Sequence, residues 1–191
     1  MKCYVPQVAL LTFFLTFFAT AQDRLSSSES KFLSMDIEKS IISNTENSKN
    51  HTTLFAAMKA SDLEKILSYD GPFTVFAPSD IAFEALFSIN SFDPMDPKNK
   101  EELQALLRYH IIAGKFTASK ILKAMCSGEG KAVFTTVQGE ELTTTMNGTD
   151  IILTDNFGNS AKIIAADANQ CNGVMHAIDS VILPKRTSFL P

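Results

Sequence analysis

Two apolar segments about a hundred residues apart constrain this chain more than any other feature. The first runs from Pro72 to Phe83 and reads PFTVFAPSDIAF, and the second runs from Asn172 to Pro184 and reads NGVMHAIDSVILP. β-Branched and aromatic residues favour a pleated backbone, and a proline, which has no N–H to donate, can end a strand. The sequence therefore predicts two buried strands, the second from Val174 to Leu183.

Apolar residues at helical spacing flank the first strand. A first helix is predicted from Ser34 with Ile37, Ile41 and Ile42 on its inner face, and a second over 53–60. Capping residues mark the starts of further helices. They are Ser61 with Glu64 in a capping box, Ser79 or Asp80 after the strand, Asp96 followed by Pro97 before a helix that ends at Tyr109, and Thr117.

Past Gly130 the pattern changes to short strands. They are predicted at 132–138, 141–146, 151–154, 161–165 and 174–183, with Asn147-Gly148 as the strongest hairpin signal. A helical first half and a strand meander in the second half fit an α+β fold better than alternating βαβ units.

Three sequence elements carry a resemblance to a known family. They are the TVFAP segment with Thr74, Phe76, Pro78, Asp80 and Phe83, the Tyr109-His110 pair after a leucine-rich helix, and the final segment with Asn172, Gly173, His176 and Asp179. In this order the elements resemble the fasciclin-like domain family. The resemblance covers 34–184 and implies a β-rich wedge or sandwich with several flanking helices.

The beginning of the chain reads as a secretory signal peptide over residues 1–21. Lys2 precedes an apolar stretch over 8–18, and Ala19-Thr20-Ala21 is a small-x-small cleavage site. A membrane anchor is the alternative, but the stretch is shorter than the ~20 residues that span a bilayer. A polar tether over 22–33 and a short tail over 185–191 complete the predicted organisation. We expect a secreted or extracytoplasmic protein in the periplasm, at the cell surface or in a matrix, with no transmembrane segment after removal of the leader.

Net charge and cysteine content indicate which partners the protein can bind and whether it can form a disulfide. The formal net charge is −4, and no basic cluster stands out in the sequence, so nucleic acid is not an expected partner. Loss of Cys3 with the leader leaves Cys126 and Cys171, for which a disulfide is the favoured prediction in an oxidising compartment. Two free thiols are the alternative.

Motifs for catalysis, cofactors and metals are not recognised. The sequence has no nucleophile elbow and no zinc-ligand spacing, so no catalytic, cofactor-binding or metal-binding residue is predicted. Asp155, Asn156 and Asn159 are interpreted as hairpin residues instead of calcium ligands, and Asp179 as a structural hydrogen-bonding residue. Two glycosylation sequons begin at Asn50 and Asn147.

The histidines permit two interpretations. His110 and His176 have apolar neighbours, so they are expected to be core residues with satisfied hydrogen bonds. The resemblance also suggests Tyr109-His110 as a candidate interaction motif, and a pH-sensing role for the histidines is a further alternative.

The function predicted from these features is non-covalent adhesion or attachment to an extracellular protein or polysaccharide, without enzymatic activity. The alternative is an extracytoplasmic small-molecule carrier or hydrolase that uses a cleft near Tyr109 and His110.

Overall fold

A computed structural model of the 191-residue chain describes residues 35–69, 71–89, 93 and 96–185. The predicted leader and tether lie outside these residues, as does the predicted tail beyond Lys185. No helix within the described ranges has the length and apolar content needed to cross a membrane.

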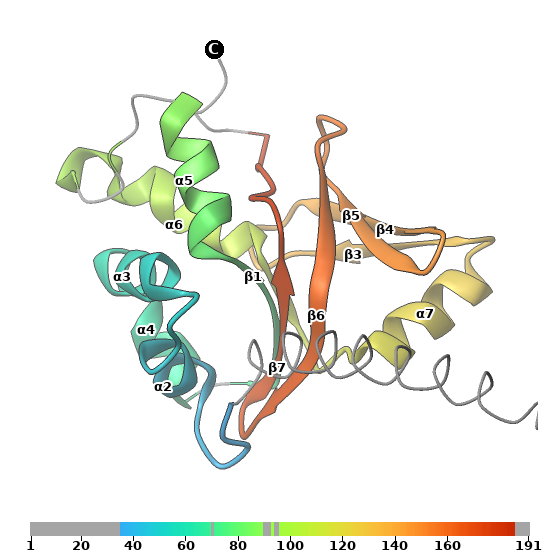
Figure 1. Ribbon diagram of the computed structural model, residues 1–191, viewed down its shortest axis with the longest axis horizontal. Coiled ribbons are helices and arrows are strands. Elements are labelled where there is room, and N and C mark those ends of the chain that lie inside the picture. Colours follow the sequence, from blue (N-terminus) through green and yellow to red (C-terminus); the bar gives the residue numbers. More distant parts are fainter. Residues whose placement is uncertain (1–34, 70, 90–92, 94–95, 186–191) are drawn as a thin grey trace, which may run out of the picture. The chain divides into compact units, whose positions relative to one another are not determined.

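Helices dominate the first half of the described chain (Figure 1). They are α2 (Ile41–Glu46), α3 (Thr52–Ala60), α4 (Leu63–Tyr69), α5 (Asp80–Ile89), the 3-10 turn η1 (Pro97–Asn99), α6 (Lys100–Tyr109) and α7 (Ala118–Ser127). Strand β1 (Phe73–Pro78) and the short β2 (Ile111–Ala113) lie between them, as the sequence pattern predicts for β1.

The second half forms the rest of a seven-stranded sheet. Its strands are β3 (Lys131–Thr135), β4 (Glu141–Asn147), β5 (Asp150–Thr154), β6 (Ser160–Gln170) and β7 (Gly173–Ile178). The spatial order is β2-β1-β7-β6-β5-β4-β3, in which β1 and β7 pair in parallel and the other pairs are antiparallel. An isolated bridge between Ile112 and Thr136 links the region of β2 to the end of β3, so the sheet curls back toward itself.

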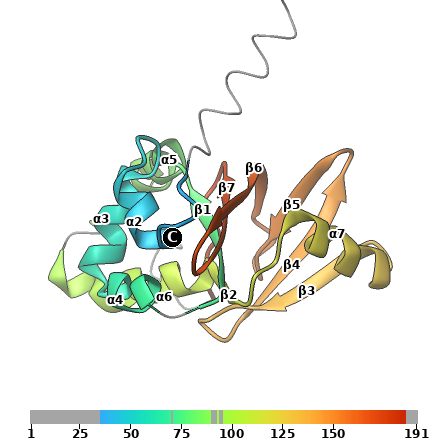
Figure 2. The same cartoon turned by 90° about the horizontal axis from the view of Figure 1, so that it is seen from below.

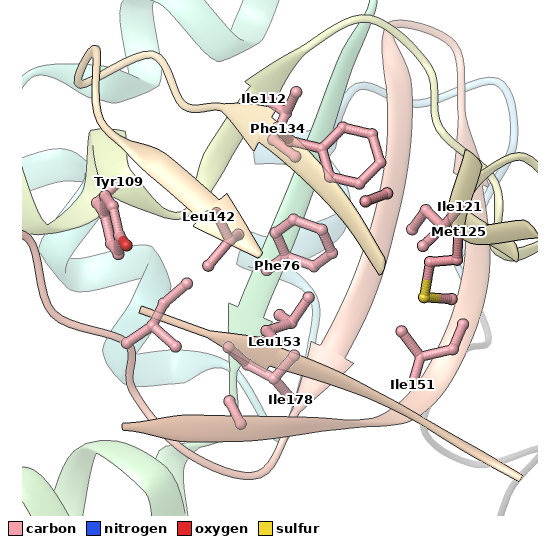
Figure 3. Close-up of a cluster of buried hydrophobic side chains, with 13 residues drawn as sticks. Phe76, Tyr109, Ile112, Ile121, Met125, Phe134, Leu142, Ile151, Leu153 and Ile178 are labelled. Atoms are coloured by element: carbon pink, nitrogen blue, oxygen red, sulfur yellow. The ribbon is translucent and has the colours of Figure 1, made fainter. Parts of the chain in front are cut away.

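Strands β1 and β7 are buried because both of their faces are covered. Figures 1 and 2 show α2 to α6 on one side of these strands and β3, β4, β5 and α7 on the other. Phe76 and Ile178 point into the core enclosed by the sheet, where Ile121 and Met125 of α7 also pack (Figure 3). The α+β fold, with helices first and a strand meander second, is thus confirmed.

Two helix starts differ from the prediction. Ser40 caps α2 through a hydrogen bond from Ser43 N to its hydroxyl, and Ile37, expected inside a helix, is 63% exposed in the preceding turn. Ser61 was expected to cap α4. Its hydroxyl instead donates to the carbonyl of Ala57, which closes the end of α3, and Asp62 then turns the chain with a φ of 59°.

The last two strands also differ from the prediction. β6 extends to Gln170, past the predicted end at 165, because two register shifts let it follow β7. β7 ends at Ile178 and not at Leu183. Beyond Ile178, Asp179 continues the contact with β6 through its backbone and its side chain. Its N–H donates to the carbonyl of Lys162, and its carboxylate accepts from Lys162 N at 2.7 Å.

The predicted disulfide is wrong, because Cys126 and Cys171 are free and exposed. Cys126 lies on the solvent side of α7, next to the inward-facing Met125. Cys171 lies in the turn between β6 and β7, where its N–H donates to the carbonyl of Lys39. An even number of cysteines does not fix their geometry, and a disulfide requires Cα atoms within about 7 Å.

Asn172 joins the helices to the sheet. Its side-chain oxygen accepts from Ile41 N at 2.9 Å, its amide nitrogen donates to Leu67 O at 2.6 Å, and its carbonyl accepts from Phe73 N. The next residue, Gly173, lies so close to β1 that a Cβ atom there would stand 2.1 Å from Phe73 O. The Asn-Gly pair therefore holds α2, α4 and β1 together at the start of β7.

Replacement of Asn172 by Ala should destabilise the domain by about 2 kcal/mol, because two partly buried backbone groups lose their partner. Asn172→Asp keeps an acceptor for Ile41 N but loses the donor to Leu67 O, so it should also destabilise. Urea unfolding followed by circular dichroism measures both effects. Asn156→Ala, at an exposed turn, is the control, and equal unfolding midpoints for Asn156→Ala and Asn172→Ala would contradict the role of this junction.

Candidate interaction surface

Tyr109, the first residue of the predicted interaction motif, lies in the core. Its side chain is fully buried beside Leu142, in the core cluster that also contains Phe76 (Figure 3), and its hydroxyl donates to Glu141 O at 2.9 Å. Burial raises the pKa of Tyr109, and the negative charges of Asp155 and Glu140 raise it further. The hydroxyl therefore stays protonated and serves as a hydrogen-bond donor to β4.

His110 is also buried, and both of its ring nitrogens are occupied. Nδ1 donates to Leu106 O at 2.8 Å, and Nε2 accepts from Ile182 N at 3.3 Å. One nitrogen must donate and the other accept, so this arrangement requires a neutral ring. Burial lowers the pKa of His110 to about 4, partly offset by the Leu106 carbonyl. The ring thus attaches the segment after β7 to the end of α6.

His176, in β7, also links two backbone groups through its two ring nitrogens, as His110 does. Nε2 donates to Phe116 O at 2.8 Å, and Nδ1 accepts from Asp167 N at 3.2 Å. Its ring stacks on Phe76 with a centroid separation of 5.7 Å. Burial lowers the pKa of His176, with a partial offset from the Phe116 carbonyl and the Asp167 carboxylate. Asp167 has a φ of 64° in the irregular part of β6 and also accepts from Ala118 N at 2.8 Å, which fixes the start of α7.

Other residues of the resembling motifs also lie at junctions. Thr74 donates to Gly114 O and accepts from Phe116 N. Asp80 accepts from Thr52 N and Thr53 N, and so caps α3 from a neighbouring helix, while Ser79 caps α5. Pro78 ends β1 opposite Ile178, and Phe83 is buried and stacks on Phe87. These side chains hold neighbouring elements together.

An open surface lies on the opposite side of the sheet from α7. Alternate residues of β3 to β6 point away from the core, and the strand register sets them side by side. We call this surface the outer sheet face. It comprises Lys131, Val133, Thr135, Glu141, Thr143, Thr145, Ile152, Thr154, Ser160 and Lys162.

The centre of the outer sheet face is uncharged. Val133, Thr143, Thr154 and Ser160 form one row across the four strands, and Val133 is 51% exposed. The methyl groups in this row can contact an apolar surface of a partner while the hydroxyl groups exchange hydrogen bonds with it. The alternation in β3 to β5 is visible in the sequence, but this face is not among the predicted sites, because only the strand register shows which residues are neighbours.

The turn between β5 and β6 borders this face. Asp155 is buried, and its carboxylate accepts from Phe157 N, Asn159 N and the Asn159 side chain, each at 2.9 Å, and from Leu183 N at 3.1 Å. Its acceptor capacity is therefore used by the protein itself. Among the described residues, no group of three or more His, Cys, Asp or Glu side chains is placed to hold a metal ion.

Comparisons with known proteins identify the family. The fasciclin domain matches residues 49–184. The chain belongs to the fasciclin domain family. It is 38% identical to Protein sll1483 of Synechocystis over 149 residues, which cover 78% of this chain and 76% of that protein. It is 30% identical to transforming growth factor-beta-induced protein ig-h3 of Sus scrofa over 137 residues, which cover 69% and 17% of the two chains.

A solved structure agrees with the fasciclin fold. A FAS1 domain pair from the insect cell adhesion molecule Fasciclin I superposes with a TM-score of 0.67 at 15% identity. The match covers 77% of this chain and 51% of the other, so this fasciclin domain spans about half of that solved chain.

Acidification should weaken this fasciclin domain. The folded-state pKa of His110 is about 4, below the ordinary 6.5, so its stabilising contribution is complete above pH 6.5 and is lost as the pH falls toward 4. The loss should be on the order of 3 kcal/mol, and His51 and His176, whose pKa values burial also lowers, should add to it. Urea unfolding at a series of pH values measures this slope.

His110→Gln is the matched variant for this test. A glutamine amide can donate to Leu106 O and accept from Ile182 N, but it does not titrate. Its unfolding free energy should therefore change less between pH 6.5 and 4 than that of the wild type. An identical slope in both proteins would assign the acid sensitivity to other groups.

Proposed function

We propose that this fasciclin domain acts outside the cytoplasm as a non-covalent adhesion module that binds an extracellular protein or polysaccharide through its outer sheet face. The observation that carries the proposal is the uncharged row in which Val133, 51% exposed, lies beside the half-buried Thr143. Val137, in the turn after β3, is a further exposed apolar residue, at 44%. The likeness to a domain pair of an insect cell adhesion molecule supports the same class of function.

The chemistry of the face suits recognition of a broad, flat partner. Threonine side chains on a strand are stiff, because branching at Cβ restricts their rotamers. Ordering them against a partner therefore costs less side-chain entropy than ordering lysine or glutamate. The row that contains Val133 and Thr143 has Lys131 and Lys162 on one side, and Glu141 lies on its other side. Charged residues therefore flank an uncharged centre. This distribution is typical of binding interfaces.

The hydrogen bonds of His110 and His176 favour a structural role over a catalytic one for these two residues. Both ring nitrogens of His110 and of His176 exchange hydrogen bonds with the backbone, and the Tyr109 hydroxyl donates to a carbonyl. A general base needs a free nitrogen within reach of a substrate proton. We infer that these residues stabilise the fold that presents the outer sheet face.

Val133→Lys should reduce retention of the partner about tenfold, because a charged side chain at the centre of the face must be desolvated on binding. The immobilised protein is exposed to secreted and envelope fractions of its producer, and retained proteins and glycans are quantified by mass spectrometry and glycan analysis. Ile81→Lys is the matched control, since Ile81 is an equally apolar residue on α5 that is 74% exposed.

Equal retention by the wild type and both variants would contradict the assignment of the outer sheet face. Equal loss in both variants would show that added charge, and not its position, reduces retention. Thermal melting of each variant verifies that the fold is unchanged.

A further inference from the structure

Helix α7 and the residues beside it form a basic region on an acidic protein. The segment 115–130 contains Lys115, Lys120 and Lys123 and a single acidic residue, Glu129, whereas the whole chain has a formal net charge of −4. Elsewhere, Lys39, Lys65 and Lys100 form salt bridges with aspartates. The chain as a whole has no basic cluster that predicts nucleic-acid binding, but α7 and the loop before it carry a local excess of positive charge.

The lysines of α7 share one exposed side of the helix. Ile121 and Met125 face the core, while Lys120 and Lys123, which are one turn apart, are exposed. The Lys120 ammonium donates to Lys115 O at 2.8 Å, which places it beside the loop that carries the Lys115 side chain. Within the described part of the chain, none of these three ammonium groups forms a salt bridge. Their charge is therefore available to an external anion.

We propose that this exposed side of α7, the α7 face, binds an acidic polysaccharide that carries a carboxylate or sulfate group on its repeating unit. A single exposed ion pair contributes little and is screened by salt, so an isolated anion would be held weakly. A polymer with regularly spaced anions engages Lys115, Lys120 and Lys123 together, and each further contact is intramolecular. The positive α7 face also favours the approach of a polyanion that the rest of the acidic domain repels.

The composition of the α7 face favours a polysaccharide over a lipid bilayer. A helix that lies in a membrane interface directs its apolar side away from the rest of the protein and into the lipid. In α7 that side is buried against the sheet, and the exposed side has one larger apolar residue, Leu122, at 37% exposure. Helix α7 contains no aromatic residue on which nucleic acid bases could stack, and Phe116, next to Lys115, packs against Phe134 of the core.

The α7 face is separate from the outer sheet face. Ala132 and Phe134 of β3 belong to the core that contains Ile121 and Met125, whereas Val133 points to the opposite side of the strand. The proposal therefore goes beyond the proposed function and does not depend on it. Substitutions on one face leave the other intact.

The test measures binding of the full chain to immobilised polygalacturonate at low ionic strength and near 0.15 M salt. The wild type should bind, and more weakly at the higher salt concentration. The double variant Lys120→Gln, Lys123→Gln should bind about tenfold more weakly. The matched control, Lys39→Gln with Lys65→Gln, removes the same charge from lysines that pair with aspartates, and it should bind within about twofold of the wild type.

Three results would overturn the proposal. They are the absence of wild-type binding to polygalacturonate, equal losses in the two double variants, and binding to phosphatidylglycerol vesicles without binding to polygalacturonate, which would assign the α7 face to a membrane surface. Glutamine has nearly the helix propensity of lysine, so both double variants should keep the wild-type melting temperature. Val133→Lys, which tests the outer sheet face, should not weaken binding to polygalacturonate.

Discussion

The parallel pairing of β1 with β7 is the constraint on which the rest of the structure depends. It joins two segments that are far apart in the chain, from Phe73 opposite Gly173 to Pro78 opposite Ile178. Parallel strands are stable chiefly when both faces are buried, and here helices cover one side and the curled sheet covers the other. The pairing requires close backbone contact at its first position, where a Cβ atom on Gly173 would collide with Phe73 O. Without this pair, neither the helices nor the strand meander would have a surface to pack on.

Neutral histidines extend this central pair to its neighbours. His110 connects α6 to the chain after β7, and His176 connects β7 to the loop before α7 and to the irregular part of β6. A neutral imidazole is suited to such junctions because one compact ring supplies both a donor and an acceptor. Its protonation adds a second donor where an acceptor is needed. The packing that makes the domain rigid is therefore also the source of its expected acid sensitivity.

Sequence patterns predicted those parts of the fold that local chemistry decides. β1 follows from β-branched and aromatic residues before a proline, and Leu103, Leu106 and Leu107 are buried on α6 as helical spacing requires. Other features depend on contacts between distant residues. The Ser61 hydroxyl can either cap the start of α4 or bond to the end of α3. In the folded domain it donates to the carbonyl of Ala57 in α3. Likewise, the pairing of Cys126 and Cys171 could not be judged from their number, and the outer sheet face became visible only with the strand register.

The motif residues and the candidate binding surfaces are physically separate. Asn172, His176 and Asp80 are held by backbone groups of neighbouring elements, so their replacement would disturb the fold before any contact with a partner. Val133, Thr143 and Lys120 have side chains directed toward solvent or open to it, and their replacement should alter binding while the core stays intact. A fold held together by buried junctions can therefore keep its architecture while its surface chemistry changes. For this reason family membership defines the scaffold of this domain, and its partner must be inferred from the outer sheet face and the α7 face.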